Sequence, residues 1–209
     1  MKNPGKHADE VKSLFRRLSR DGKPAPRQPQ DPLKALVRAA MSFDMPDARA
    51  EEAMKAIEGE FVDLNELRVA TELEVQELLG TKYPAIEKRV NMITLALNNI
   101  FEREHTLSLE RLRGVSKRDA RQFLRELPEA HPFVEGYVML MSFDGHAMPV
   151  DELMLQYLRD LEIIEEDTTL EETQRFLEHH LKAEDCYDFF TLVRRASQDD
   201  GESRRKKKA

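Results

Sequence analysis

Asp151 is the residue of this sequence whose type and position most favour a role in chemistry. It follows Pro149-Val150, and three leucines come within the next seven residues, as in a loop that leads into a helix. A carboxylate held at such a place can stabilise developing positive charge or take a proton from a nucleophile. Aspartate at a helix start is also a common cap, and on the local sequence alone the cap is the commoner role.

Two adjacent histidines, His179 and His180, stand between Glu178 and Glu184 and invite comparison with a metal site. Neighbouring positions on a helix point about 100° apart, so the two imidazoles make a poor pair of ligands. We therefore expect surface residues and no metal here. The sequence also contains no glycine-rich phosphate loop, nucleophile elbow or zinc spacing, and we expect no cofactor.

The chain contains one cysteine, Cys186, among 209 residues. This excludes an internal disulfide framework and a cluster held by several cysteines, and it fits a reducing compartment. No apolar run approaches the length of a membrane span, and no signal peptide opens the sequence. We therefore expect a cytoplasmic protein with no membrane partner.

The elements that would position Asp151 are all helical. Apolar residues recur every three or four positions, and no segment alternates as a strand would. Asp31-Pro32 predicts a capped helix start, and Thr71 with Glu74 predicts a capping box for a helix that ends at Gly80. Helices are expected near residues 8–20, 32–44, 48–61, 63–67, 71–79, 84–100, 108–113, 116–126, 132–143, 149–161, 169–181 and 184–197.

The net charge of -7 conceals an uneven distribution along the chain. Residues 1–30 carry eight Lys or Arg against three acids, and Arg204, Arg205, Lys206, Lys207 and Lys208 form a basic tail. Residues 31–203 are left with about -17. Basic ends can grip nucleic acid without sequence preference, although solvated tails are the commoner outcome of such runs. Residues 198–209 are expected to be disordered.

Residues 127–153 resemble the hairpin and catalytic loop of the endonuclease III-like DNA glycosylases, of the helix-hairpin-helix (HhH-GPD) superfamily. The pattern of these proteins is roughly L-P-G-V-G-x-K-T-A, an apolar helix, and V-D-T-H. Without a gap, Leu127-Pro128 match its L-P, Tyr137 to Phe143 match the apolar helix, and Val150-Asp151 match its V-D. Met41 to Asp47 are similar to a second segment, L-S-A-Q-A-T-D. The resemblance implies that Asp151 is the catalytic aspartate and that DNA is the partner.

Several positions depart from that pattern. Glu129 and His131 stand at the hairpin glycines, which let backbone N–H groups approach a phosphate. Phe133 stands at the lysine of the lyase members and cannot form a Schiff base. Lys117 precedes it on another predicted helix and is expected to be a solvated surface residue. Asp44 stands at the glutamine that fills the gap left by a flipped base.

The resemblance implies a two-lobed all-α fold with DNA across the cleft. Residues 31–145 would form a six-helix barrel lobe with a degenerate hairpin. Residues 1–30, a basic helix and linker, would join residues 146–197 in a terminal helical lobe. The iron-sulfur module that follows this fold in many members is absent, because the sequence offers only Cys186.

Two functions remain open on the sequence. One is a divergent base-excision-repair glycosylase that lacks the lyase step and uses Asp151 alone. The other is an inactive glycosylase-fold protein that binds DNA or a protein partner. The nucleic-acid-binding positions implied by the resemblance and the charge pattern are Asp44, Glu129, His131, Phe133, Arg204, Arg205, Lys206, Lys207 and Lys208.

Overall fold

The computed structural model describes the backbone of residues 4–208 and the side chains of residues 5–199. Every regular element in this range is helical, which confirms the predicted all-α class. The elements are α1 (Pro4–Arg20), α2 (Pro32–Ser42), α3 (Asp47–Glu60), α4 (Leu64–Val69), α5 (Glu72–Leu79), α6 (Ile86–Glu104), the 3-10 helix η1 (Glu110–Gly114), α7 (Lys117–Arg125), α8 (Pro132–Ser142), α9 (Glu152–Asp160), α10 (Leu170–His180) and α11 (Ala183–Lys208).

Local capping bonds that the sequence predicts are present at the start of α2 and at both ends of α5. Asp31 accepts a hydrogen bond from the backbone of Lys34, and Pro32 occupies the first turn of α2. Thr71 and Glu74 form the expected capping box, and Gly80 ends α5 with a φ of 72°. These three features confirm the predictions made for α2 and α5.

Two helix boundaries differ from the sequence prediction. α9 begins at Glu152 rather than near residue 149, because Asp151 itself is the cap and the residues before it are not helical. α11 continues to Lys208, whereas disorder was predicted from residue 198. Lysine, arginine and glutamate have high helix propensity, so a charged sequence can extend a helix that already has a packed base.

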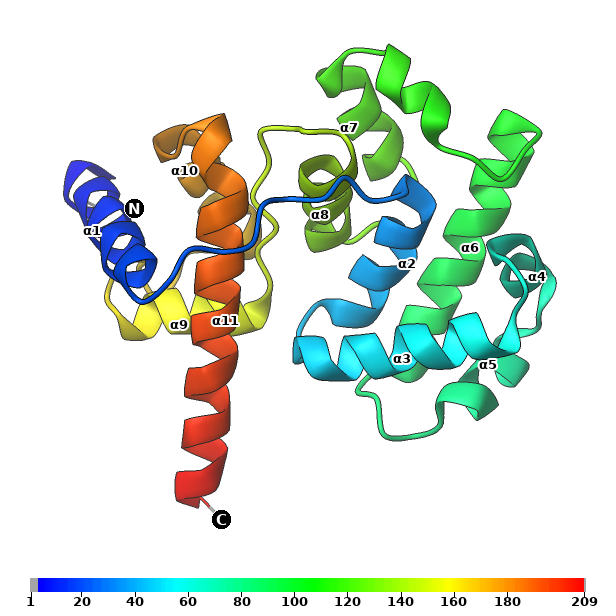
Figure 1. Ribbon diagram of the computed structural model, residues 1–209, viewed down its shortest axis with the longest axis horizontal. Helices are drawn as coiled ribbons and strands as arrows, with labels where there is room; N and C mark the ends of the chain where they lie inside the picture. Colours follow the sequence, from blue (N-terminus) through cyan, green and yellow to red (C-terminus); the bar gives the residue numbers. More distant parts are fainter. Residues whose placement is uncertain (1–3, 209) are drawn as a thin grey trace.

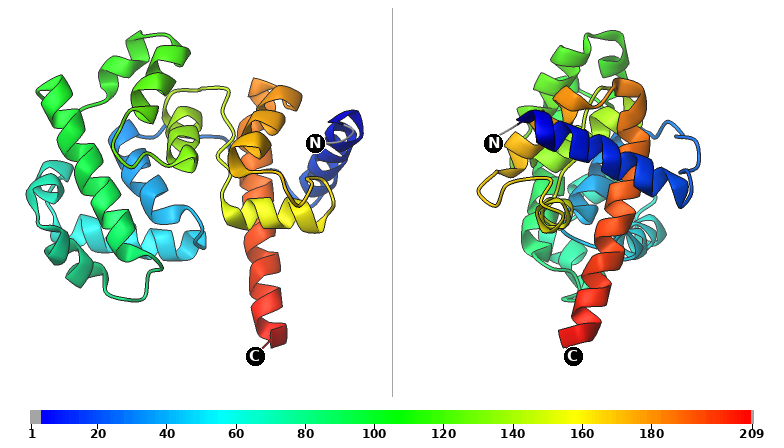
Figure 2. Two further views of the ribbon diagram at one scale, coloured as in Figure 1. Left: turned by 180° about the vertical axis from the view of Figure 1, so that it is seen from behind. Right: turned by 90° about the vertical axis from the view of Figure 1, so that its left-hand side faces the viewer.

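The helices gather into two lobes (Figures 1 and 2). In one lobe α2 packs against α3, α6 and α8, while α4 and α5 pack on α6 and α7 packs on α8. In the other lobe α1 and α9 pack on α11, and α10 packs on α9. The last turns of α11 extend past the other helices of their lobe in all three views. No helix in the described part of the chain is both long and apolar enough to cross a membrane.

The central helices α2 and α8 are almost completely buried, so water is not available to the carbonyl groups at their ends. At the end of α8, cationic side chains donate hydrogen bonds to these carbonyl groups in place of water. Arg27 donates to the Leu140 carbonyl at 2.8 Å, and Arg113 and Lys117 donate to the carbonyls of the two residues that follow Met141. Lys117 is exposed, as expected, but its ammonium group serves this helix end. Cations at a C-terminus also interact favourably with the helix dipole.

The C-terminal end of α2 is treated in the same way by Arg89 of α6. This guanidinium is only 1% exposed and donates to the carbonyls of Ala40 at 2.9 Å, Phe43 at 2.7 Å and Pro84 at 2.8 Å. Burial lowers the pKa of Arg89, and the nearby carboxylates of Asp44 and Asp151 counter part of that effect. Arg89 therefore fixes the backbone at the start of the turn between α2 and α3.

Candidate functional site

Asp151 is the N-cap of α9 and has no exposed surface. Its Oδ1 accepts a hydrogen bond from the backbone of Met154 at 3.0 Å. Its Oδ2 accepts two more, from the backbone of Asp44 at 2.9 Å and from Nη1 of Arg194 at 2.8 Å. The capping role that the local sequence favours is thus present, and three donors surround the carboxylate.

Arg194 joins α11 to the turn between α2 and α3. Its Nε donates to Asp47 at 2.7 Å, and its Nη2 donates to the carbonyls of Ser42 at 2.7 Å and Met45 at 3.1 Å. The guanidinium is 3% exposed. Burial lowers its pKa, but the carboxylates of Asp151 and Asp47 outweigh burial, so the pKa of Arg194 is raised. The side chain stays charged and holds both lobes.

Asp44 completes a reciprocal contact across the lobes. Its backbone donates to Asp151, and its own Oδ1 accepts from the backbone of Glu152 at 2.8 Å. The residue adopts a left-handed conformation, with a φ of 52°. Asparagine and aspartate tolerate this region best among residues other than glycine. The carboxylate of Asp44 thus serves the first turn of α9, in the other lobe, beside the cap Asp151.

Phe133 lies in the core and is fully buried. Its ring packs against those of Tyr137 and Phe190, with centroids 5.9 and 6.2 Å away. The guanidinium carbon of Arg194 lies 5.1 Å from the centroid of the Phe133 ring, within the range of a cation–π contact. The position that the resemblance aligns with the lyase lysine therefore holds an apolar ring, and the cation beside Asp151 comes from α11.

Residues 127–131, between α7 and α8, form the loop that the resemblance aligns with the hairpin and that is called the hairpin loop below. Glu129 is exposed and has a φ of 54°, so it adopts the left-handed conformation without a glycine. His131 caps α8, with Nδ1 accepting from the backbone of Phe133 at 3.2 Å, and its ring stacks on Phe43 at 4.4 Å. Burial lowers the pKa of His131. The loop still connects α7 to α8. A carboxylate and an imidazole stand at the two positions where the resemblance has glycines.

A cavity of about 430 Å³ lies where the lobes meet, next to the buried pair of Arg194 and Asp151. Tyr137 and Phe190 contribute aromatic surface, and Asp47 and Arg194 contribute charge. Asp151 does not line this cavity, because Arg194 stands between the two. Access to the carboxylate from this side would require Arg194 to move.

The remaining sequence candidates lie apart from this cluster. Arg204 to Lys208 belong to the last turns of α11, and their side chains fall outside the described residues. His179 and His180 lie near the end of α10, and no group of three or more potential metal ligands occurs in the described part of the chain. The structure thus gathers Asp44, Phe133 and Asp151 around one centre, with His131 and Glu129 at its hairpin edge.

Arg194 was missed by the sequence interpretation although it organises this centre. The signal was present in the spacing of α11, because Arg194 follows Phe190 by four positions and Cys186 by eight, on the buried face of the helix. A charge on an apolar stripe must find a partner when the stripe is buried. Periodicity alone did not reveal that the partner was Asp151.

Comparison with solved structures identifies the fold. An 8-oxoguanine glycosylase/lyase of Clostridium acetobutylicum bound to duplex DNA aligns with a TM-score of 0.73 at 18% identity, covering 94% of this chain and 70% of that one. A non-covalent endonuclease III–DNA complex aligns with 0.71 at 13% identity, covering 90% and 84%. The 3-methyladenine DNA glycosylase MagIII of H. pylori, bound to 1,N6-ethenoadenine, aligns with 0.68 at 16% identity, covering 94% and 98%.

No protein-family model and no curated protein matches the sequence. The structural likeness is nevertheless extensive, and the chain has the two-lobed helix-hairpin-helix DNA glycosylase fold. The sequence resemblance to these glycosylases is confirmed at the level of the fold. The roles of individual residues do not follow from identities this low.

Proposed function

We propose that this chain is a DNA-binding protein built on the glycosylase fold and that it does not excise bases. The observation that carries the proposal is the state of Asp151, which has no exposed surface and is paired with Arg194 at 2.8 Å. A glycosylase must flip a base out of the duplex and bring a carboxylate to its sugar. A buried carboxylate that is held by three donors inside the protein is poorly placed for that task.

Phe133 supports the same conclusion, because a buried phenyl ring supplies no amine for a covalent intermediate. Asp44 adds to it, since its carboxylate is committed to the start of α9 rather than to a DNA strand. At both of these positions, where the resemblance would have a side chain that acts on DNA, the side chain instead makes contacts within the protein.

DNA binding is supported by charge and shape rather than by the hairpin. Five consecutive cations, Arg204 to Lys208, stand at the end of a helix that projects from the body (Figure 1). Lys12, Arg16 and Arg20 are exposed on α1 in the same lobe. Glu129 places a negative charge at the hairpin loop, where the resemblance would have a phosphate. Binding is therefore expected to be weak, independent of sequence and carried mainly by the two basic segments.

The catalytic part of the proposal is tested with duplexes that each carry one damaged base, such as 8-oxoguanine, uracil or 1,N6-ethenoadenine. Single-turnover base release is followed for the intact protein and for Asp151→Asn. We expect no release above the Asp151→Asn background and no covalent adduct on borohydride trapping with abasic DNA. Release of any base that Asp151→Asn abolishes would refute the proposal. An adduct abolished by Lys117→Ala would show that the lyase position had been assigned wrongly.

The binding part is tested by fluorescence anisotropy on an undamaged duplex across a salt series. Counterion release predicts a log-log slope of about -0.9 for each neutralised phosphate. Deletion of residues 204–208 should weaken binding and flatten the slope, whereas Glu129→Gly with His131→Gly should strengthen binding if the loop keeps its shape. An unchanged affinity and slope after the deletion would mean that the folded body holds the DNA.

A monofunctional glycosylase is the second candidate, and the cavity of about 430 Å³ favours it. Tyr137 and Phe190 offer aromatic surface of the kind on which bases stack, beside polar groups that could orient an edge. Excision would require Arg194 to withdraw from Asp151 when DNA is bound. The lesion panel distinguishes the two candidates, because only this one predicts release that depends on Asp151.

A further inference from the structure

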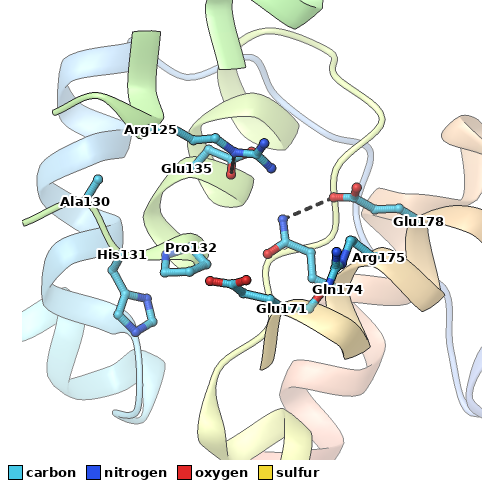
Figure 3. A pocket seen from close by; sticks show the side chains of 9 residues that line it. All are labelled: Arg125, Ala130, His131, Pro132, Glu135, Glu171, Gln174, Arg175 and Glu178. Atoms are coloured by element: carbon cyan, nitrogen blue, oxygen red, sulfur yellow. Dashed lines mark hydrogen bonds and ion pairs between the residues drawn. The ribbon is translucent and has the colours of Figure 1, made fainter. Parts of the chain in front are cut away.

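A second cleft lies on the opposite side of α8 from Phe133, between the hairpin loop and α10 (Figure 3). Glu135 follows Phe133 by two positions, which turns it about 200° around the helix. The cleft has a volume of about 370 Å³, within the range of small-molecule sites. Its polar lining comes from both lobes and includes Arg125, Glu135, Glu171, Gln174 and Arg175.

The deep wall of this cleft is charged but internally balanced. The Glu135 side chain is 3% exposed and is paired with Arg121 and, at 2.8 Å, with Arg125. Glu178 is paired with Arg121 at 2.6 Å and also accepts from the backbone of Met148 at 3.0 Å. Two carboxylates therefore face two guanidinium groups, so the net charge of this wall is zero and it favours neither a cation nor an anion.

Gln174 leaves an acceptor unused in the same place. The residue is 5% exposed, and its Nε2 donates to Oε1 of Glu178 at 3.2 Å. Its Oε1 accepts no hydrogen bond from any residue that the structure describes, and Figure 3 shows the amide directed into the cleft. The amide oxygen is therefore available to accept a hydrogen bond from an N–H group of a molecule in the cleft.

The rim offers one more acceptor and two sets of donors. The Glu171 carboxylate is exposed and makes no ion pair within the described residues. Arg175 uses only Nε, toward the backbone of Glu171 at 3.3 Å, and Arg125 uses only Nε, toward Glu135. The terminal nitrogens of both arginines thus remain available at the cleft. These cationic groups and the Glu171 carboxylate line the same cleft.

We propose that this cleft binds a small zwitterion of the α-amino-acid type. The carboxylate of such a ligand would pair with the free nitrogens of Arg125 and Arg175, as charge-assisted hydrogen bonds favour. Its ammonium group would donate to Oε1 of Gln174 and to Glu171. A ligand without net charge fits a wall without net charge. A phosphate dianion would be repelled by the carboxylates of the cleft, and a polyamine would be repelled by its guanidinium groups. The proposal is independent of whether Asp151 is catalytic, because the two sites lie on different faces of α8.

The test uses isothermal titration calorimetry of the full chain with each of the twenty α-amino acids in turn. For the strongest binder, the amide, which lacks the carboxylate, and the N-acetyl derivative, which lacks the ammonium, serve as matched probes. Glu171→Gln and Arg175→Gln are the test variants, because both side chains are exposed and their loss does not disturb the core. Glu166→Gln, an exposed acid of the same lobe outside the cleft, is the control.

We expect a saturable one-site isotherm for at least one amino acid and at least a tenfold weaker affinity for both derivatives. Glu171→Gln and Arg175→Gln should each weaken binding about tenfold, and Glu166→Gln should leave it unchanged. The absence of saturable heat for all twenty compounds would overturn the proposal. Equal binding of either derivative, or an unchanged affinity in both test variants, would overturn it as well.

Discussion

Replacing Arg194 with methionine tests the account of the site most directly. The change keeps a long side chain in the space between α11 and the turn after α2 but removes the cation. Asp151, with no exposed surface, would keep its backbone donors and lose the one charged hydrogen-bond partner that it has among the described residues. The carbonyls of Ser42 and Met45 would each lose the hydrogen bond from Arg194 in the same step, and Ser42 would keep the one from the backbone of Met45 at 3.3 Å.

The expected loss is large for one residue. Removing one partner of a buried ion pair costs about 3–5 kcal/mol, mostly because the other charge stays buried. Total stability of a domain is about 5–15 kcal/mol, so the variant should remain folded but with a much lower urea midpoint. Asp151→Leu should cost a similar amount, because it leaves Arg194 buried with only the half-exposed Asp47 as a charged partner.

The double variant Asp151→Leu with Arg194→Met separates pairing from simple packing. With both charges gone, the loss should be close to that of either single variant and well below their sum. The measurement is the free energy of unfolding in urea for the four proteins at pH 7. A loss below about 1 kcal/mol for Arg194→Met, or strictly additive losses in the double variant, would show that the pair is not the buried electrostatic centre described above.

Four further changes give independent checks. Gly136→Ala should destabilise the protein by about 1–3 kcal/mol, because a Cβ would lie 3.1 Å from Cα of Pro149. Gly59→Ala in α3 meets no atom within 4 Å and should stabilise the protein by about 0.5–1 kcal/mol. Equal urea midpoints for the two variants would contradict this. Glu129→Gly should raise stability by about 0.5–1 kcal/mol by relieving a left-handed φ of 54°, and a loss would show that the carboxylate matters more. Burial lowers the pKa of His131, so the neutral imidazole stabilises the fold above the ordinary pKa of 6.5, and this stabilisation is lost as the pH falls below 6.5. The difference in unfolding free energy between the intact protein and His131→Asn, measured at pH 7.5 and at pH 5.5, should therefore be smaller at pH 5.5.

The parts of the fold that the sequence predicts well are those decided by neighbours along the chain. Thr71 and Glu74 lie three residues apart, and Asp31 precedes its helix directly, so their capping bonds are local. The start of α9 was misjudged by three residues because Pro149 is an acceptable first-turn residue, and only the tertiary contacts of Asp151 decide which residue caps. The basic tail was misjudged because composition outweighed helix propensity in the interpretation.

The site was predicted only in part, for a related reason. Asp151 was found from its spacing to a recognisable segment, and its capping role from its position before a helix. Arg194 could not be paired with it in the same way, since the two stand 43 residues apart and Asp47 stands 147 residues away. Which buried cation meets which buried carboxylate depends on how the lobes dock, and one sequence carries no direct record of that.

The cations at the ends of α2 and α8 determine how the protein comes apart. Arg194 serves the carbonyls after α2 from the terminal lobe, and Arg27 serves the end of α8 from the linker. A fragment of residues 31–145 would lack both arginines and therefore lose these hydrogen bonds between the lobes. We expect the two lobes to unfold as one cooperative unit, with coincident transitions by every probe, and the barrel lobe not to fold in isolation. We therefore expect that the boundary visible between the lobes does not separate two independently unfolding units.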